Sequence, residues 1–272
     1  MDKDIINITT RLKNAGIENY IFEAKVIEAH IRKNMLDSVD REDIIRRRIS
    51  REPLQYILSE WEFYGDVYKL NRDCLIPRPE TEFLTEYIIN NARHDSIIID
   101  LCSGSGCVSI SAVKRRKDLT AVLIDIALGA VEISKENAEL NGVSDRVKSY
   151  CLDIIEDFDE VVNFIHTHLP KIGMIVSNPP YLTKSDMEMI KTDRTELWHE
   201  PAIAFAGGDD GLDFYRFIIN NYSKPFNLKT AVEAGIDQSK DIVKMFDEIG
   251  FSCSIIRDYY KIERVIVGEK QD

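Results

Sequence analysis

The sequence predicts an α/β fold preceded by a small helical domain, on two observations. In the first seventy or so residues, apolar side chains recur with helical spacing. From Ser96 onward, short apolar runs alternate with helical segments, which is the pattern of a doubly wound parallel sheet. We therefore expect residues 1–58 to form a helical bundle, residues 59–80 a hairpin linker, and residues 81–272 the sheet domain.

The N-terminal helices are predicted from a stripe and its boundaries. The apolar positions that share one helix face are Tyr20, Ala24, Ile27 and Ile31. Ser38 or Asp40 can cap the next helix, which extends through Ile49 and stops at Pro53. The stretches 62–65 and 67–70 then read as two short strands, because aromatic and β-branched residues surround Gly65.

Seven strands are predicted after the linker. They are expected at residues 97–99, 121–124, 147–151, 172–176, 231–234, 253–256 and 264–267. Only a short polar stretch separates the last two, which favours antiparallel pairing over a crossover. A parallel sheet that ends in an antiparallel hairpin is the Rossmann-like arrangement typical of methyltransferases.

Composition limits the class of protein. The 272 residues are enough for a buried core, and no apolar run approaches the roughly 20 residues that span a bilayer. The first residues lack the pattern of a signal peptide, so we expect a cytoplasmic protein without a membrane partner. The net charge of −12 argues against a protein that tracks along nucleic acid. Five cysteines form no Cys-x-x-Cys pair, and no metal site is indicated.

A glycine-containing loop follows the first predicted strand of the sheet. It comprises Cys102, Ser103, Gly104, Ser105 and Gly106. Position 109 is serine, so the dinucleotide fingerprint is incomplete and pyrophosphate binding is doubtful. Asp125 ends the next strand, where a carboxylate can accept from two ribose hydroxyls of an adenosine cofactor. Asp153, beside Ile154, could contact the adenine amino group or simply cap a turn.

A second loop follows the fourth strand and comprises Asn178, Pro179, Pro180 and Tyr181. Asn178 offers a carbonyl acceptor, the two prolines have no N–H, and Tyr181 would add an aromatic wall. Such a loop suits a planar amino group, although Asn-Pro-Pro alone is usually a turn that ends a strand. Together with Asp125 and the glycine loop, it favours S-adenosylmethionine over NAD as the cofactor.

Several motifs resemble those of the peptide chain release factor N5-glutamine methyltransferases, the HemK/PrmC type, over nearly the whole chain. The segments that carry the resemblance are 53–57, 62–65, 75–82, 200–205 and 207–212, together with Glu233 and Gln238. Ser59 stands where the family usually has glycine, and Cys102-Ser103 replaces the commoner Gly-Thr. The loop detail therefore departs from the family pattern.

The resemblance implies that S-adenosylmethionine is the methyl donor and that the substrate is the glutamine of a release-factor Gly-Gly-Gln motif. Asn178 and the Pro179 carbonyl would accept the two amide N–H bonds, and Tyr181 and the segment around Arg78 and Glu80 would line the pocket. No catalytic histidine is assigned. The protein is expected to be a monomer.

Three alternatives remain open at this point. The first is an adenine-N6 DNA methyltransferase, because an exocyclic amine needs the same acceptors; net charge and the lack of a DNA-reading domain oppose it. The second is a methyltransferase for glutamine in another translation protein. The third is an inactive module that docks on a translation factor.

Overall fold

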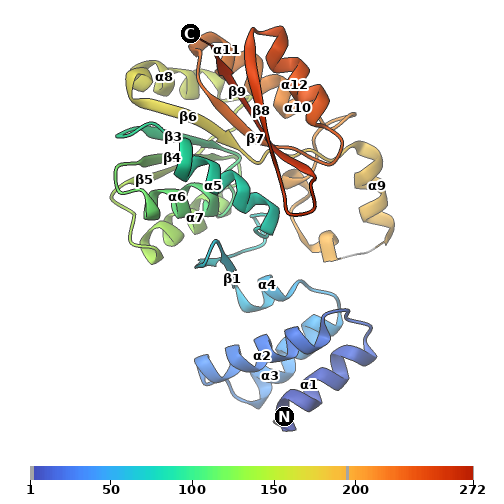
Figure 1. Ribbon diagram of the computed structural model, residues 1–272. Helices are drawn as coiled ribbons and strands as arrows, with labels where there is room; N and C mark the ends of the chain where they lie inside the picture. Colours follow the sequence, from blue (N-terminus) through green and yellow to red (C-terminus); the bar gives the residue numbers. More distant parts are fainter. Residues whose placement is uncertain (1–2, 194–195, 272) are drawn as a thin grey trace.

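The computed structural model describes residues 3–193 and 196–271. Figure 1 shows the N-terminal helices lying below a twisted sheet that has helices on both faces. The N-terminal helices are α1 (Lys3–Asn14), α2 (Tyr20–Asn34), α3 (Ser38–Ile49) and α4 (Leu54–Leu58). None of the described helices is both long and apolar enough to cross a membrane.

The cap of α3 differs from the predicted one. Asp37, and not Ser38 or Asp40, is the N-cap: its Oδ1 accepts from the backbone N–H groups of Val39 at 2.7 Å and Asp40 at 3.0 Å. The Asp40 side chain accepts in return from the Asp37 N–H, at 3.4 Å. This reciprocal capping box satisfies donors that the first helical turn leaves free, which explains why the helix begins one residue after Asp37.

The four N-terminal helices have a hydrophobic core of their own. Of the predicted stripe, Ala24, Ile27 and Ile31 are buried in it, and Tyr20 packs against it. Leu54 and Ile57 of α4 belong to the same core. The helical part of the chain therefore packs as a unit up to α4.

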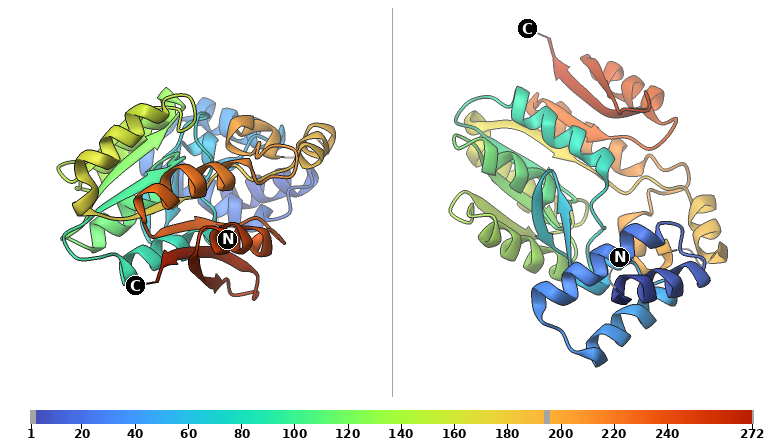
Figure 2. Two further views of the ribbon diagram at one scale, coloured as in Figure 1. Left: turned by 90° about the horizontal axis from the view of Figure 1, so that it is seen from above. Right: turned by 60° about the horizontal axis from the view of Figure 1, so that its bottom comes forward.

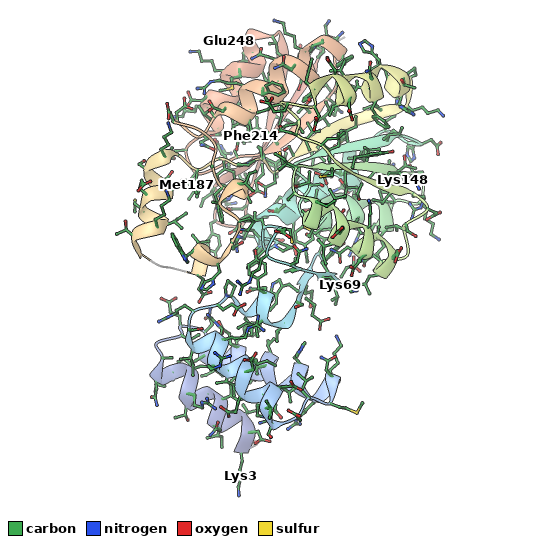
Figure 3. The ribbon with its side chains drawn as sticks, turned by 180° about the vertical axis from the view of Figure 1, so that it is seen from behind. Lys3, Lys69, Lys148, Met187, Phe214 and Glu248 are labelled. Atoms are coloured by element: carbon green, nitrogen blue, oxygen red, sulfur yellow. The ribbon has the colours of Figure 1, made fainter. Side chains whose placement is uncertain are left out.

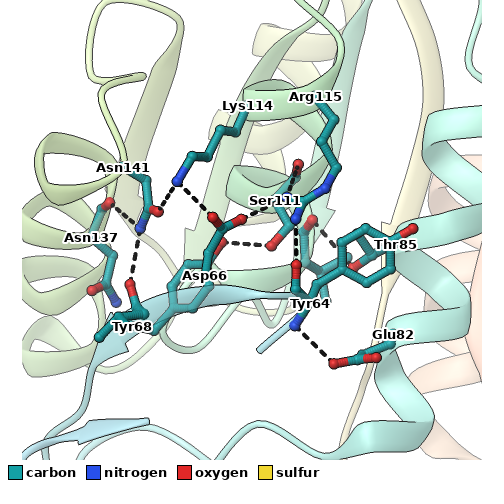
Figure 4. Close-up of polar contacts among 12 residues, drawn as sticks. Tyr64, Asp66, Tyr68, Glu82, Thr85, Ser111, Lys114, Arg115, Asn137 and Asn141 are labelled. Atoms are coloured by element: carbon teal, nitrogen blue, oxygen red, sulfur yellow. Dashed lines mark hydrogen bonds and ion pairs between the residues drawn. The ribbon is translucent and has the colours of Figure 1, made fainter. Parts of the chain in front are cut away.

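The hairpin formed by β1 (Glu60–Phe63) and β2 (Asp66–Lys69) is fastened to the sheet domain, as Figure 4 shows. Tyr64 and Gly65, the two residues between the strands, both have positive φ, as a type I′ turn requires. Asp66 forms ion pairs with Lys114 and Arg115, each at 2.6 Å. The Tyr68 hydroxyl and Ser111 Oγ lie 2.6 Å apart. These contacts fix the start of the linker.

The large sheet has the strand order β5-β4-β3-β6-β7-β9-β8. Its strands are β3 (Ile97–Leu101), β4 (Thr120–Asp125), β5 (Val147–Cys151), β6 (Ile172–Ser177), β7 (Thr230–Glu233), β8 (Phe251–Arg257) and β9 (Glu263–Lys270). The first five are parallel, and β8 pairs antiparallel with β9, which confirms the predicted ending. β9 lies between β7 and β8 and is antiparallel to both.

Helices cover both faces of the sheet, which Figure 2 shows from above. The covering helices are α5 (Glu82–Asn91), α6 (Cys107–Arg115), α7 (Leu128–Leu140), α8 (Phe158–His168), α10 (Asp213–Ile218) and α12 (Ser239–Glu248). Neighbouring residues of a strand alternate between the two layers: Ile98 packs with α5 and α6, whereas Ile99 packs with α8 and α10. Burial on both faces explains why the strands read as continuous apolar runs.

The remaining elements are short, and most lie in the connections. They are η1 (Pro79–Thr81), η2 (Leu169–Lys171), α9 (Lys184–Asp193), η3 (Glu196–His199), η4 (Ala202–Ala204), η5 (Ile219–Ser223) and α11 (Lys224–Phe226). Figure 3 shows α9, marked by Met187, standing out from the side of the sheet domain. Along the chain, the segment from α9 to η4 connects the loop after β6 to α10.

Candidate active site

A cavity of about 1090 Å³, including its open mouth, lies at the carboxyl ends of β3, β4, β5 and β6. This is where an open α/β sheet binds its ligand. Most of its wall comes from three groups of residues. The strand-end loops contribute residues 102–105, 125–126, 152–155, 178 and 180; the linker and η1 contribute 73–75, 77, 78 and 81; η4 and α10 contribute 203, 204 and 214.

The glycine loop forms one wall of the cavity. Cys102, Ser103, Gly104 and Ser105 all line it, as predicted from the sequence. Gly106 does not, and it stands behind the wall at the start of α6. Its φ is 77°, and a Cβ there would come within 2.6 Å of Leu123 and 2.8 Å of Ile110, so glycine is required for packing.

Cys102 stands where the family more often has glycine, and its surroundings give a physical reason for this departure. Its φ is 59°, a left-handed conformation that glycine adopts more easily than any residue with a Cβ. The side chain packs against the apolar layer under α8 and α10, and burial raises the pKa of its thiol. Compared with glycine, cysteine adopts this positive φ less easily, but its side chain adds apolar packing.

Asp125 connects the glycine loop to the turn after β4. Its Oδ2 accepts from the N–H of Gly104 at 2.8 Å, and its Oδ1 accepts from the N–H of Ala127 at 2.9 Å. Burial raises the pKa of this carboxyl group, against the lowering effect of the backbone bonds. Each carboxylate oxygen keeps a second lone pair, so Asp125 can still accept from hydroxyl groups of a ligand in the cavity.

Asp153 and Ile154 also line the cavity. Asp153 Oδ1 accepts from the N–H groups of Ile155 at 2.7 Å and Glu156 at 3.3 Å, which is the turn-capping role that the sequence left open. Its contact with an adenine ring remains a prediction. Ile154 is buried, and its carbonyl accepts a hydrogen bond from the Tyr222 hydroxyl, so this part of the wall is held from behind.

Asp100 is a site residue that the candidate set from the sequence did not include. It is buried near the end of β3, lines the cavity, and accepts from Ser109 Oγ at 2.7 Å. Burial raises the pKa of its carboxyl group to about 7, and the Asp125 carboxylate adds to this. A cationic ligand group would favour the charged form. The sequence feature that could have identified Asp100 is a carboxylate inside an apolar strand, just before the glycine loop.

The loop after β6 brings Asn178 and Pro180 to the cavity. Asn178 Nδ2 donates to the Thr81 hydroxyl at 3.2 Å, which joins this loop to η1. Within the described part of the chain, Asn178 Oδ1 makes no hydrogen bond, so its acceptor capacity is available to a ligand.

Pro179 and Tyr181 are the other two residues of this loop. Neither is among the described residues that line the cavity. Tyr181 is half-buried against the apolar cluster around α12, and its carbonyl accepts from Gln238 Nε2 at 2.9 Å. This backbone bond holds the loop, and the ring packs against that apolar cluster. Their roles toward a substrate stay predictions.

Two of the motifs singled out in the sequence meet beside the cavity. Glu200 Oε1 pairs with Arg78, and Glu200 Oε2 accepts from the N–H of Ile76 at 3.0 Å. This fixes η4, whose Ile203 and Ala204 line the cavity. Arg78 lines the cavity, whereas Glu80 does not. The two motifs thus form one wall, although more than 100 residues separate them in the chain.

Known proteins resemble this chain at the level of sequence and fold. The Methyltransferase small domain family matches residues 79–197. A "Release factor glutamine methyltransferase" of Geobacter sulfurreducens is 34% identical over 83% of this chain and 76% of its own length. One of Fusobacterium nucleatum subsp. nucleatum is 34% identical over 98% of this chain and 78% of its own length.

Among solved structures, the hMettl16 catalytic domain in complex with the MAT2A 3'UTR hairpin 6 has a TM-score of 0.60 at 14% identity. It covers 85% of this chain and 83% of its own. At this identity the likeness concerns the fold alone. The sequence matches over most of both chains carry the family assignment, and the chain belongs to the release factor glutamine methyltransferases.

Proposed function

We propose that this chain transfers the methyl group of S-adenosylmethionine to the side-chain amide nitrogen of glutamine in the Gly-Gly-Gln motif of peptide chain release factors. Membership of the family makes the chain an S-adenosylmethionine-dependent protein-glutamine methyltransferase. One observation carries the proposal furthest: Asn178 shares a cavity with Gly104 and Asp125, and its amide nitrogen is already bonded to Thr81. Its oxygen is therefore the atom available to a substrate amide.

The residues of the cavity fit the proposed cofactor. Gly104 allows the backbone to approach closely, and Asp125 would accept from the ribose hydroxyls. Asp100 carries a buried carboxyl group that a cationic amino group would stabilise in its charged form. Asp153 and Ile154 would flank the adenine. When bound, S-adenosylmethionine supplies an electrophilic methyl group.

The substrate side of the mechanism depends on acceptors. An amide nitrogen is a poor nucleophile because its lone pair is delocalised into the carbonyl. Asn178 Oδ1 and the Pro179 carbonyl would accept its two N–H bonds, which orients the nitrogen and stabilises the positive charge that develops on it. No strong base is required, because an N-alkylated amide cation is acidic enough to lose its proton to water. No histidine is among the described residues that line the cavity.

Mass spectrometry tests the proposed function directly. The full-length chain is incubated with S-adenosylmethionine and a purified release factor, and the modified residue is located by fragmentation. We expect one added methyl group on the glutamine of Gly-Gly-Gln and none on a release factor in which alanine replaces that glutamine. Methylation of adenine in DNA, with no change in the release factor, would contradict the proposal.

The Asp125 carboxylate gives a prediction for cofactor binding. Asp125→Ala is expected to weaken S-adenosylmethionine binding by roughly 1.5–3 kcal/mol, about 10- to 150-fold, because a charged acceptor loses its hydroxyl donors. The Gly104 N–H also loses its partner. Isothermal calorimetry measures the Kd. Asp145→Ala, at an exposed turn position, is the matched control and should bind normally. Tighter binding of NADH than of S-adenosylmethionine by the unmodified chain would overturn the cofactor assignment.

Three finer features belong to the same proposal. The chain would act as a monomer, and it would act in the cytoplasm because its proposed substrates are translation factors. It would bind release factors without contacting nucleic acid, which the net charge of −12 supports. Residues 1–58, 59–80 and 81–272 would act as bundle, linker and catalytic domain, which the separate core of the N-terminal helices supports. Light scattering and salt-dependent binding to a duplex test the first two.

A further inference from the structure

Glu233 is a buried carboxylate to which the steps described above give no role. It ends β7, its residue is 1% exposed, and its Oε2 makes no hydrogen bond with the described residues. Leaving a buried carboxylate oxygen unpaired is costly, and glutamine or an apolar residue would suit a purely structural position better. The position therefore suggests a functional requirement for this side chain.

Thr81 links Glu233 to the proposed substrate site. The Thr81 hydroxyl lies beside the Glu233 carboxyl group and lowers its pKa, and Thr81 Oγ1 accepts from Asn178 Nδ2 at 3.2 Å. Thr81 itself is buried, with 2% of its surface exposed. A hydroxyl group has a single proton to donate. When Thr81 donates that proton to the Glu233 carboxylate, it can only accept from Asn178.

The direction of the hydrogen bond between Asn178 and Thr81 decides which way the Asn178 amide faces. The nitrogen is turned toward Thr81, so the oxygen is left for the substrate. An amide rotated by half a turn would present N–H donors to the N–H donors of the glutamine and could not hold it. We propose that Glu233 is a positioning residue that acts through Thr81 to present Asn178 Oδ1 to the substrate amide. This inference rests on the proposed function and adds to it the group that sets the polarity of the site.

The ionisation of Glu233 gives the inference a pH signature. Burial raises the pKa of its carboxyl group to about 7. Thr81, and then Arg264 and Arg78, act to lower this pKa, whereas Glu80 acts to raise it. Two further groups face it, the hydroxyls of Tyr181 and Tyr215, and Arg264 is itself paired with Asp258 at 2.9 Å.

A protonated Glu233 can donate to Thr81, which frees the threonine proton for Asn178 Oδ1 and permits the unproductive orientation. The turnover number kcat should therefore rise as the pH increases through about 7.

The test compares four forms of the full-length chain on a Gly-Gly-Gln peptide: unmodified, Thr81→Val, Thr81→Ser and Glu233→Gln. Valine keeps the shape of threonine but lacks the hydroxyl, and we expect kcat to fall by about tenfold or more with little change in the Kd of S-adenosylmethionine. Serine restores the hydroxyl and should restore most of kcat. Glu233→Gln should flatten the rise of kcat near pH 7, because glutamine has no proton to lose there.

Two results would overturn the inference: Thr81→Val with the kcat of the unmodified chain, or Glu233→Gln with the pH rise intact. If Thr81→Val fails to fold, the pH profile of Glu233→Gln decides alone. Failure of the proposed function looks different, because then the unmodified chain would not methylate the peptide at any pH.

Glu233→Gln should also change stability in a pH-dependent way. A carboxyl group whose pKa is raised in the folded state stabilises the fold fully below its ordinary value of 4.5, and that contribution is lost as the pH rises through about 7. Glutamine does not titrate, so the variant does not lose this stability as the pH rises. The Tm of the variant minus the Tm of the unmodified chain should therefore be larger at pH 8 than at pH 5. Asp100 titrates in both forms and cancels in the difference. Thermal melts at the two pH values check this, and an equal difference at both would contradict the buried charge.

Discussion

Replacement of Asn178 by alanine is expected to lower kcat by about 10²-fold or more, the scale of losing one preorganised polar contact in a transition state. The structure supports a selective effect. Asn178 reaches the cavity from the β6 loop, whereas the glycine loop and Asp125, which would hold the cofactor, come from β3 and β4. The Kd of S-adenosylmethionine should therefore change by no more than a few fold. Single-turnover methylation of a Gly-Gly-Gln peptide, with calorimetry of the cofactor, measures both quantities.

Two further variants show whether the acceptor causes the loss. Asn220→Ala removes an asparagine from an exposed position on η5 and should leave kcat unchanged. Asn178→Asp keeps an oxygen toward the substrate but places an acceptor opposite the Thr81 hydroxyl, so it should also be impaired. A parallel loss of cofactor binding and turnover in Asn178→Ala would mean that the residue supports the cofactor site and does not act on the substrate.

The strands could be predicted from the sequence because parallel strands are buried on both faces. The run 147–151 coincides with β5, and the run 172–176 falls one residue short of the end of β6. The apolar character of such a strand is a property of its own residues, so the sequence shows it directly. The cap of α3 was placed wrongly because three polar residues occur close together, and the choice of Asp37 depends on a bond that returns from Asp40.

The site could be predicted only where its residues are local to a strand end. Residues 102–105 of the glycine loop, Asp125 and Asn178 end or follow apolar runs, and all line the cavity. Thr81 and Glu233 could not be assigned roles in this way, because their connection to Asn178 exists only when η1, β6 and β7 are brought together. The packing of Tyr181 could not be predicted for the same reason, since Gln238, far along the chain, holds its backbone.

Removal of the residues before Pro53 is expected to lower kcat/KM for a whole release factor by about 10²-fold, the equivalent of roughly 3 kcal/mol of binding energy. A short Gly-Gly-Gln peptide should be much less affected, because it has no remote surface that could contribute binding energy. The N-terminal helices have their own core and carry exposed apolar side chains, such as Phe22 at 57% exposure. We propose that they dock on the release factor. The measurement is kcat/KM on both substrates, for the full-length and truncated chains.

The structure adds a second route by which truncation could act, and it needs its own control. Arg48 of α3 is buried, pairs with Glu23 at 2.6 Å, and also binds Glu196 of η3, in the segment that leads to the cavity wall. The helices therefore contact the catalytic part as well as presenting a free surface.

Glu196→Gln weakens this contact and keeps every helix in place. If docking is the function of the helices, Glu196→Gln retains methylation of both substrates and only the truncated chain discriminates against the whole release factor. If Glu196→Gln harms the peptide reaction as much as truncation does, the helices act by holding the η3–η4 segment against the site, and docking is wrong. Truncation also uncovers Leu54 and Ile57 of α4, so binding of S-adenosylmethionine must first show that the shortened chain is folded.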